Sequence, residues 1–343
     1  MREPGFWYGS PSQLSWPLSW LLSLVAKIYG AATARRMARG GVSIGIPVFC
    51  VGNYHVGGAG KTPTTLALAH ILAGMGERPF VVSRGYGGRL RGPVRVDSGR
   101  HSAIDVGDEP LMMASRVPVV VSRDRAVGAK LARGEGASVI LLDDGFQNPA
   151  LAKDASLIVI DGVRGLGNGL VFPSGPLRAP LPPQLARTDA LIVIGQGRAA
   201  TDVADNVAAR GGLVLRGVLA PDRGSLQQLR GRRVLAFAGI GDPARFFATL
   251  RSSGVDVVGE RIFADHHSFA ASEIKRLASD AAAQSLMLVT TEKDFTRIAS
   301  NPVLAGWKDE ITPFAVTLEI GNEAALRGFL ADRFAKARGY QTP

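Results

Sequence analysis

The stretch from Pro47 to Thr65 constrains the fold of this chain more than any other. It contains a short apolar run of the kind found in buried strands (48–51), then a turn dense in glycine, then a helical pattern that continues to Met75. Glycines let such a turn curl so that successive N–H groups face one anion, and the start of the following helix attracts negative charge. This order of strand, glycine loop and helix predicts a phosphate-binding loop. The alternative is a glycine-rich turn that binds nothing.

The end of this loop carries the side chains that nucleotide chemistry needs. Lys61 is expected to reach the β- and γ-phosphates of a nucleoside triphosphate, and the hydroxyl of Thr62 to ligate Mg²⁺. Pro63 falls near the first helical turn, where its missing N–H does no harm. One position departs from the usual pattern G-x-x-x-x-G-K-[ST], because His55 stands where the first glycine is expected.

Paired carboxylates occur twice downstream of the loop. An apolar run that ends at Leu142 leads into Asp143 and Asp144. Parallel strands place such ends at the same sheet edge as the loop, where a carboxylate can hold Mg²⁺, although an Asp-Asp-Gly turn alone would be commonplace. Asp108 and Glu109 begin a helix, where paired carboxylates serve either as caps that complement the dipole or as a general base and a metal ligand.

Other polar side chains follow strands or begin helices. Tyr86 lies among glycines and arginines after a strand, where it is able to touch a sugar or a phosphate; a plain turn is the alternative. Arg178, in a proline-rich loop, is placed to clamp an anion. His266 and His267 stand at the start of a helix, and as neighbours they point in different directions. We therefore expect a proton handler or charge partner in one of them rather than a two-ligand metal site.

Residues 1–40 combine tryptophans, a leucine-rich stretch and a group of arginines that follows it. Pro17 and Lys27 interrupt the apolar stretch, so it is too short to span a bilayer comfortably. The pattern favours a helix lying in the membrane interface. A signal peptide is disfavoured because Arg2 is balanced by Glu3. A helix packed on the protein's own core is the other alternative.

Charge and cysteine content limit the partners and the compartment. The net charge is +11, which implies an acidic partner: nucleic acid, anionic lipid or a phosphorylated substrate. Cys50 is the only cysteine, so no intrachain disulfide is possible and a reducing compartment is the natural interpretation.

The alternation of apolar strands with helical segments predicts an α/β fold, with a mainly parallel sheet of the P-loop type sandwiched by helices. At 343 residues the chain is long enough for two domains. We expect an N-terminal interfacial helical segment at 1–40, a P-loop domain at 41–215 and a smaller α/β domain at 216–343. A last strand at about Thr312 to Leu318 and a helix from about Glu323 close the chain.

Seven short motifs follow one another along nearly the whole chain: Val51–Pro63, Ser83–Gly87, Gly107–Pro110, Asp143–Gln147, Gly175–Arg178, Asp265–His266 and Thr291–Asp294. No single motif is decisive. Together and in this order they resemble the tetraacyldisaccharide 4'-kinase (lipid A 4'-kinase) family of Gram-negative bacteria, whose loop also lacks the first glycine.

The resemblance implies transfer of the γ-phosphoryl group of ATP, with Mg²⁺, to the 4'-hydroxyl of an acylated glucosamine disaccharide 1-phosphate, which gives lipid IVA. It also implies two α/β/α domains joined by a two-stranded β-linker, with ATP and sugar meeting in the cleft. The partners it implies are the lipid acceptor and the cytoplasmic face of the bacterial inner membrane, bound peripherally or monotopically. Nucleic acid is not among them, and we expect a monomer.

The resemblance also assigns roles. Asp108 matches the catalytic base and His266 its partner from the second domain, while Lys61 contacts the transferred phosphate. Tyr86, Arg123 and Arg178 match residues near the lipid acceptor or phosphates. The implied metal ligands are Thr62, Glu109, Asp143 and Asp144, and the implied ATP-binding residues are Asn53, Val56, Gly57, Gly58, Ala59, Gly60, Lys61, Thr62 and Pro63.

The sequence departs from the family pattern at Ala179, where glutamate is frequent, and at Asn148, where histidine is frequent. Two other functions compete with the kinase. A nucleotide-switch ATPase or GTPase, such as a metallochaperone, shares the loop but usually needs Cys/His clusters, which are missing here. A soluble small-molecule kinase would leave residues 1–40 unexplained.

Overall fold

The computed structural model describes residues 4–9 and 16–339, which form two α/β units. The larger is built on a nine-stranded sheet and the smaller on a four-stranded sheet. In spatial order the larger sheet contains β13 (Val316–Ile320), β8 (Leu213–Pro221), β7 (Ala190–Ile194), β6 (Ala155–Asp161), β1 (Val48–Gly52), β5 (Val139–Asp143), β2 (Pro79–Ser83), β4 (Val119–Val121) and β3 (Val94–Arg95). Only the two edge pairings, β13 with β8 and β3 with β4, are antiparallel.

Helices cover both faces of the larger sheet. Successive residues of β1 point to opposite faces: Phe49 and Val51 join one apolar core, Val48 and Cys50 the other. Strands buried on both faces are continuous apolar runs, which is why these segments lack a polar alternation. The first core includes α2 (Lys61–Gly74), α4 (Asp108–Ala114) and α12 (Glu323–Gly339), and the second includes α5 (Arg125–Gly134), α6 (Leu181–Leu185) and α7 (Thr201–Ala209).

The smaller sheet is entirely parallel and has its own apolar core on each face. Its order is β10 (Asp256–Ile262), β9 (Arg233–Ala238), β11 (Met287–Thr291) and β12 (Ile311–Phe314). Its helices are α8 (Arg223–Leu229), α9 (Pro243–Ser252), α10 (Ala271–Ala283) and α11 (Glu292–Ala299), with a short 3₁₀ helix at Ala305–Glu310. The predicted mainly parallel α/β fold with a second, smaller α/β unit is confirmed.

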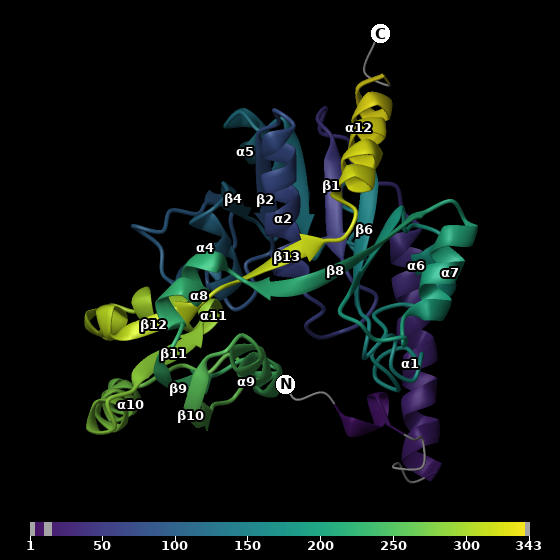
Figure 1. Cartoon of the computed structure of the whole chain (residues 1–343). Coiled ribbons are helices and arrows are strands. Elements are labelled where there is room, and N and C mark those ends of the chain that lie inside the picture. Colours follow the sequence, from purple (N-terminus) through teal and green to yellow (C-terminus); the bar gives the residue numbers. More distant parts are fainter. Residues whose placement is uncertain (1–3, 10–15, 340–343) are drawn as a thin grey trace.

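The two units are joined by β8 and β13, which pair over residues 217–221 and 316–320 and run between the units in Figure 1. The division differs from the expected one, because the chain returns to the larger sheet after Ala315. The segment expected as one strand at 312–318 is two strands in different sheets. The last helix, α12, packs on the larger core, with the ring of Phe334 5.0 Å from that of Phe49. Local strand composition does not reveal such a change of sheet.

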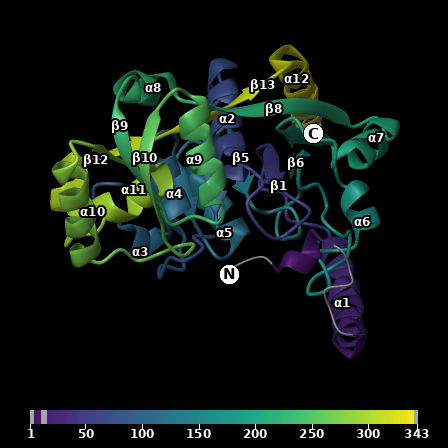
Figure 2. The same ribbon diagram turned by 60° about the horizontal axis from the view of Figure 1, so that its bottom comes forward.

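The N-terminal helix α1 (Trp16–Met37) runs beside the larger unit and projects past it in both views (Figures 1 and 2). The buried side of α1 carries small residues along most of its length: Gly30 lies against Pro180, and Ala26 and Thr33 are buried. Met37, at the end of the helix, joins the second core. Apolar side chains point outward, with Trp20 64% and Ile28 66% exposed. Among the described residues, no helix is long and apolar enough to cross a membrane.

Candidate active site

The phosphate-binding loop leaves the end of β1 at the centre of the larger sheet and ends where α2 begins, at Lys61. Two of its glycines have left-handed backbones, Gly57 with φ +107° and Gly60 with φ +85°. A Cβ on Gly60 would come within 2.5 Å of the Ile194 side chain, so this turn accepts only glycine without strain. The Asn53 side chain donates to the Gly57 carbonyl at 3.2 Å and braces the turn.

A second segment, 176–178, pairs with the phosphate-binding loop around His55, the residue that stands where the first glycine is expected. The Val56 N–H donates to Pro176, His55 forms an antiparallel bridge with Leu177, and the Arg178 N–H donates to Tyr54. The His55 ring is buried, with Nδ1 2.9 Å from the Val56 carbonyl oxygen. Burial lowers the pKa of His55 to about 4, which keeps the ring neutral near the phosphate site.

The same pairing brings Arg178 to Asp144, the second of the two carboxylates at the end of β5. Asp144 Oδ1 lies 2.8 Å from Arg178 Nη1 and 3.8 Å from Lys61 Nζ. Asp143 sits opposite Val51 in the parallel register, so it lies at the edge where the loop begins. Its Oδ2 accepts a hydrogen bond from Ser83 at 3.2 Å, and its buried Oδ1 has no partner among the described residues.

The two carboxylates have opposite electrostatic environments. Burial, with the nearby charges of Glu109 and Asp144, raises the pKa of Asp143 to about 7. Burial also opposes ionisation of Asp144, but Lys61 and Arg178 outweigh it and lower the pKa of that carboxyl. A buried carboxylate with an unused oxygen beside a phosphate loop suits a divalent cation, since Mg²⁺ is usually held by one or two carboxylates together with substrate phosphates.

No cluster of three or more His, Cys, Asp or Glu side chains able to hold a metal occurs in the described ranges 4–9 and 16–339. The buried, unpartnered Oδ1 of Asp143 fits an ion that depends on the nucleotide for its remaining ligands.

Asp108 begins α4 on the larger unit and is surrounded by groups of the smaller unit. Its Oδ2 lies 3.1 Å from His266 Nδ1 and 2.8 Å from Arg297 Nε, and Lys293 Nζ is 4.0 Å away. Its Oδ1 accepts the backbone N–H of Glu109 at 2.9 Å. Burial acts to raise the pKa of Asp108, but the His266 hydrogen bond and the charges of Lys293 and Arg297 hold it well below its usual range. The side chain is thus a carboxylate at neutral pH, and His266 Nδ1 is the donor to it.

The remaining predicted residues lie around these two centres. The Tyr86 ring is exposed and lies 5.9 Å from the His266 ring, centroid to centroid. Glu109 forms an ion pair with Lys293 at 2.8 Å. Arg123 follows β4 at the same sheet edge, is exposed, and has no ion pair with any residue that the structure describes. Thr62 follows Lys61 in the first turn of α2.

Sequence reasoning missed three cations. Lys293 and Arg297 face Asp108 from α11. Arg125 is buried near Asp143 and Asp144. Burial lowers the pKa of Arg125, and the charges of the two carboxylates act in the opposite direction. The Thr291–Asp294 motif signalled the first of these by position. Nothing local marked Arg297 or Arg125.

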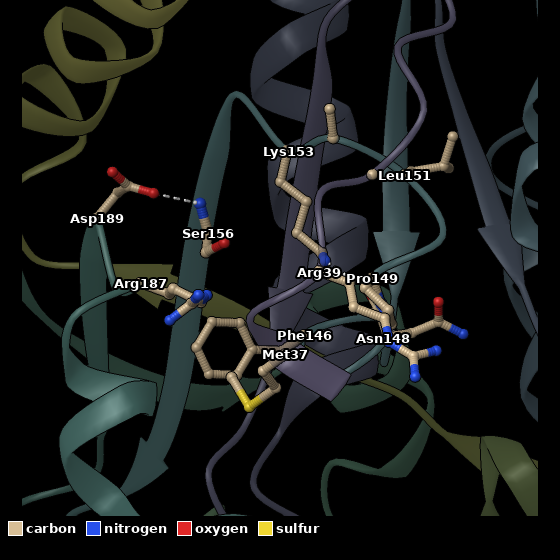
Figure 3. Close-up of a pocket in the computed structure, with 12 residues that line it drawn as sticks. Met37, Arg39, Phe146, Asn148, Pro149, Leu151, Lys153, Ser156, Arg187 and Asp189 are labelled. Atoms are coloured by element: carbon tan, nitrogen blue, oxygen red, sulfur yellow. Dashed lines mark hydrogen bonds between the residues drawn. The ribbon is translucent and has the colours of Figure 1, made fainter. Parts of the chain in front are cut away.

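Two cavities of similar volume differ in the residues that line them. One of about 210 Å³ is lined by Asp108, His266 and Arg297, together with Tyr86, Ile104 and Phe269, so it joins both units beside the carboxylate. The other, about 230 Å³, lies between the end of α1 and the turn after Asp144 (Figure 3). Its lining includes Arg39, Lys153 and Arg187 but none of the predicted nucleotide or acceptor residues. Of these two cavities, only the first is lined by predicted site residues, namely Tyr86, Asp108 and His266.

The family model described as Tetraacyldisaccharide-1-P 4'-kinase matches residues 12–335. The chain belongs to this family. A Tetraacyldisaccharide 4'-kinase of Rhodopseudomonas palustris (strain BisB18) is 62% identical over 338 residues, which is 98% of this chain and 97% of that protein. One of Nitrobacter winogradskyi is 63% identical over 98% of this chain and 99% of its own length.

A crystal structure of LpxK from Aquifex aeolicus in complex with ATP is similar in fold. It is 26% identical, with a TM-score of 0.71 over 93% of this chain and 98% of that one. The similarity spans both units rather than the phosphate loop alone. Family membership therefore decides against the nucleotide-switch and small-molecule kinase alternatives.

Proposed function

We propose that this chain transfers the γ-phosphoryl group of ATP to the 4'-hydroxyl of tetraacyldisaccharide 1-phosphate, the step that gives lipid IVA in lipid A biosynthesis. The observation that carries the proposal is the match to one kinase family across residues 12–335. The geometry supports the proposal. The buried carboxylate of Asp143 lies at the sheet edge where the phosphate loop begins, and Asp108 of the larger unit is contacted by Lys293 and Arg297 of the smaller one.

On the nucleotide side, Asn53, Val56 and the loop 57–63 surround the phosphates, and Lys61 neutralises charge on the transferred group. Mg²⁺ would be held by Thr62, Asp143 and Asp144. When bound, it adds charge neutralisation across the phosphate oxygens. The unpartnered, buried Oδ1 of Asp143 supports this assignment. Because Glu109 forms an ion pair with Lys293, we propose that it lies near the Mg²⁺ ion but is not one of its ligands.

On the acceptor side, Asp108 takes the proton of the 4'-hydroxyl as its oxygen attacks the γ-phosphorus. The bond to the β,γ-bridging oxygen breaks, and ADP leaves. A positioned base of this kind contributes roughly 10²- to 10⁴-fold. His266 orients Asp108 from the other unit, so the base is complete only when the two units meet. Tyr86, Arg123 and Arg178 contact the sugar or phosphates.

The acceptor carries several acyl chains and is a bilayer component, so the enzyme has to work at a membrane surface. We assign this contact to α1, whose exposed face includes Trp20, Leu21 and Ile28, with Arg35 and Arg36 in its last turn. A net charge of +11 favours an anionic surface. The proposed location is the cytoplasmic face of the inner membrane, bound peripherally or monotopically by a monomer.

The direct experiment supplies purified protein with ATP, Mg²⁺ and tetraacyldisaccharide 1-phosphate in detergent, and measures the phosphorylated lipid. We expect lipid product from the unchanged protein and loss of turnover, with retained ATP binding, in Asp108→Ala. His266→Ala should lose less, and His267→Ala little. ATP turnover without a lipid product would reject the proposed reaction, and near-normal turnover in Asp108→Ala would remove Asp108 as the base.

A further inference from the structure

Arg297 lies on α11 of the smaller unit and reaches into the larger one. Its side chain is 10% exposed. Nε donates to Asp108 Oδ2 at 2.8 Å, and Nη1 donates to Asp294 Oδ1 at 2.7 Å and to the Gly239 carbonyl at 3.1 Å. One guanidinium therefore joins the carboxylate of the larger unit to two segments of the smaller one.

The Gly239 carbonyl connects Arg297 to His266. This oxygen also accepts the backbone N–H of His266 at 3.1 Å, and the Gly239 N–H donates to Asp294 Oδ2 at 3.0 Å. His266 has φ +56°, a left-handed conformation that costs non-glycine residues about 1–2 kcal/mol and has to be held by surrounding contacts. Arg297 is therefore linked to both members of the Asp108–His266 pair: directly to Asp108, and through the Gly239 carbonyl to His266.

We propose that Arg297 is a positioning residue for phosphoryl transfer, which fixes Asp108 against His266 across the boundary between the units. The inference rests on the proposed role of Asp108 as the base. With Oδ2 held by Arg297 and His266, Oδ1 accepts only the Glu109 N–H from the described residues, and its second lone pair remains for the acceptor hydroxyl.

A guanidinium suits this task for two reasons. Its planar fork bonds in two directions at once, here to Asp108 and to the Asp294–Gly239 pair. It also stays protonated, so it cannot compete for the proton that Asp108 removes. Lysine carries the charge but not the fork.

The chain offers a matched control for a purely structural role. Arg116, just after α4, forms an ion pair with Glu292 of α11, and thus also joins the two units. Neither side chain contacts Asp108 or His266 by any hydrogen bond or ion pair in the described residues. If Arg297 only held the units together, its loss would resemble that of Arg116.

The test measures lipid product, kcat and the KM for ATP in Arg297→Ala, Arg297→Lys and Arg116→Ala, with thermal unfolding of each. We expect Arg297→Ala to lose about 100-fold in kcat while the KM for ATP stays within about twofold, since a misplaced base impairs the chemical step. Millimolar guanidinium chloride should restore part of that kcat, and Arg297→Lys should be intermediate. Arg116→Ala should keep its kcat, and guanidinium should not change it.

A kcat in Arg297→Ala that equals that of Arg116→Ala, or a loss that follows the fall in unfolding temperature without guanidinium rescue, overturns the inference. If Arg297→Ala does not fold, Arg297→Lys decides: full kcat in that variant would also overturn it. Asp108→Ala, assayed in parallel, distinguishes failure of the proposed base from failure of the positioning role of Arg297. An active Asp108→Ala rejects the proposed base, whereas an inactive one with a normal Arg297→Ala rejects only the positioning role.

Discussion

The carboxylate of Asp161, the last residue of β6, lies 2.6 Å from Nη1 of Arg245 in the first turn of α9. The same two segments make a second pair with the charges reversed, Arg164 Nη2 to Asp242 Oδ2 at 2.8 Å. Because β6 neighbours β1, these pairs join the smaller unit to the larger one at the phosphate-loop edge. The units thus meet here as well as around Asp108.

Removal of the Arg245–Asp161 ion pair should weaken the docking of the smaller unit on the larger one without changing the contacts of Asp108. Arg245→Met leaves Asp161 its backbone donors, the N–H groups of Val163 and Arg164. A partly exposed pair contributes about 0.2–1 kcal/mol, so we expect up to about a fivefold rise in the KM for ATP and a smaller change in kcat. Steady-state kinetics check this. Arg261→Met, which breaks a pair with Asp280 inside the smaller unit, should change neither constant.

Gly60→Ala should destabilise the fold as well as the nucleotide site. The left-handed backbone of Gly60 and the close approach of Ile194 together predict a loss of about 1–3 kcal/mol in the free energy of unfolding. Urea denaturation measures it. Gly58, in the same loop, has open space around its Cβ position. Equal stability losses in Gly58→Ala and Gly60→Ala would contradict this account.

His55 should make stability fall in mild acid. Its folded-state pKa, lowered to about 4 by burial, lies below the ordinary value of 6.5 for histidine, so the unfolded chain binds the proton more readily as pH drops below 6.5. The stability from this neutral, buried ring is present above that pH and is lost as pH falls toward 4.

Replacement of His55 by Gln removes this titration. Between pH 7 and pH 5 the free energy of unfolding of the unchanged protein should fall by about 2 kcal/mol more than that of His55→Gln, in urea titrations at both pH values. The exposed His70, changed to Gln, provides the control and should keep the full fall. A fall of the same size in His55→Gln would show that the ring does not carry the effect.

The outer face of α1 should decide membrane binding. Trp20, Leu21, Leu24 and Ile28 are exposed, and their joint replacement by Ser should lower binding to anionic vesicles by about tenfold or more. Vesicle co-sedimentation measures it, while kcat on detergent-dispersed lipid should stay unchanged. Val303→Ser, which alters an exposed apolar side chain of the smaller unit, should bind as before. Undiminished binding of the α1 variant would place the membrane contact elsewhere.

The sequence alone determined the phosphate loop, the carboxylates at the end of β5 and the mainly parallel α/β architecture. These features are local or follow from one rule: parallel strands present their carboxyl ends at a common edge, so Asp143 had to lie near the loop that begins after Val51. The Asp108 and His266 assignments came from ordered motifs, and their 3.1 Å contact agrees with that pairing.

Only the tertiary structure decided which groups surround Asp108 and where the smaller unit ends. Arg297 is 189 positions from Asp108 and reaches it through the docking of two separately packed units, which no local periodicity encodes. The sequence gives no local sign of the change of sheet at Ala315, because β12 and β13 are both short, largely apolar strand segments separated by that single residue. His55 departs from the usual pattern of the loop. The structure shows that it pairs with Leu177 and that its buried ring is hydrogen-bonded to the Val56 carbonyl. Contacts between distant segments depend on the packing of whole elements, and that packing is settled only in three dimensions.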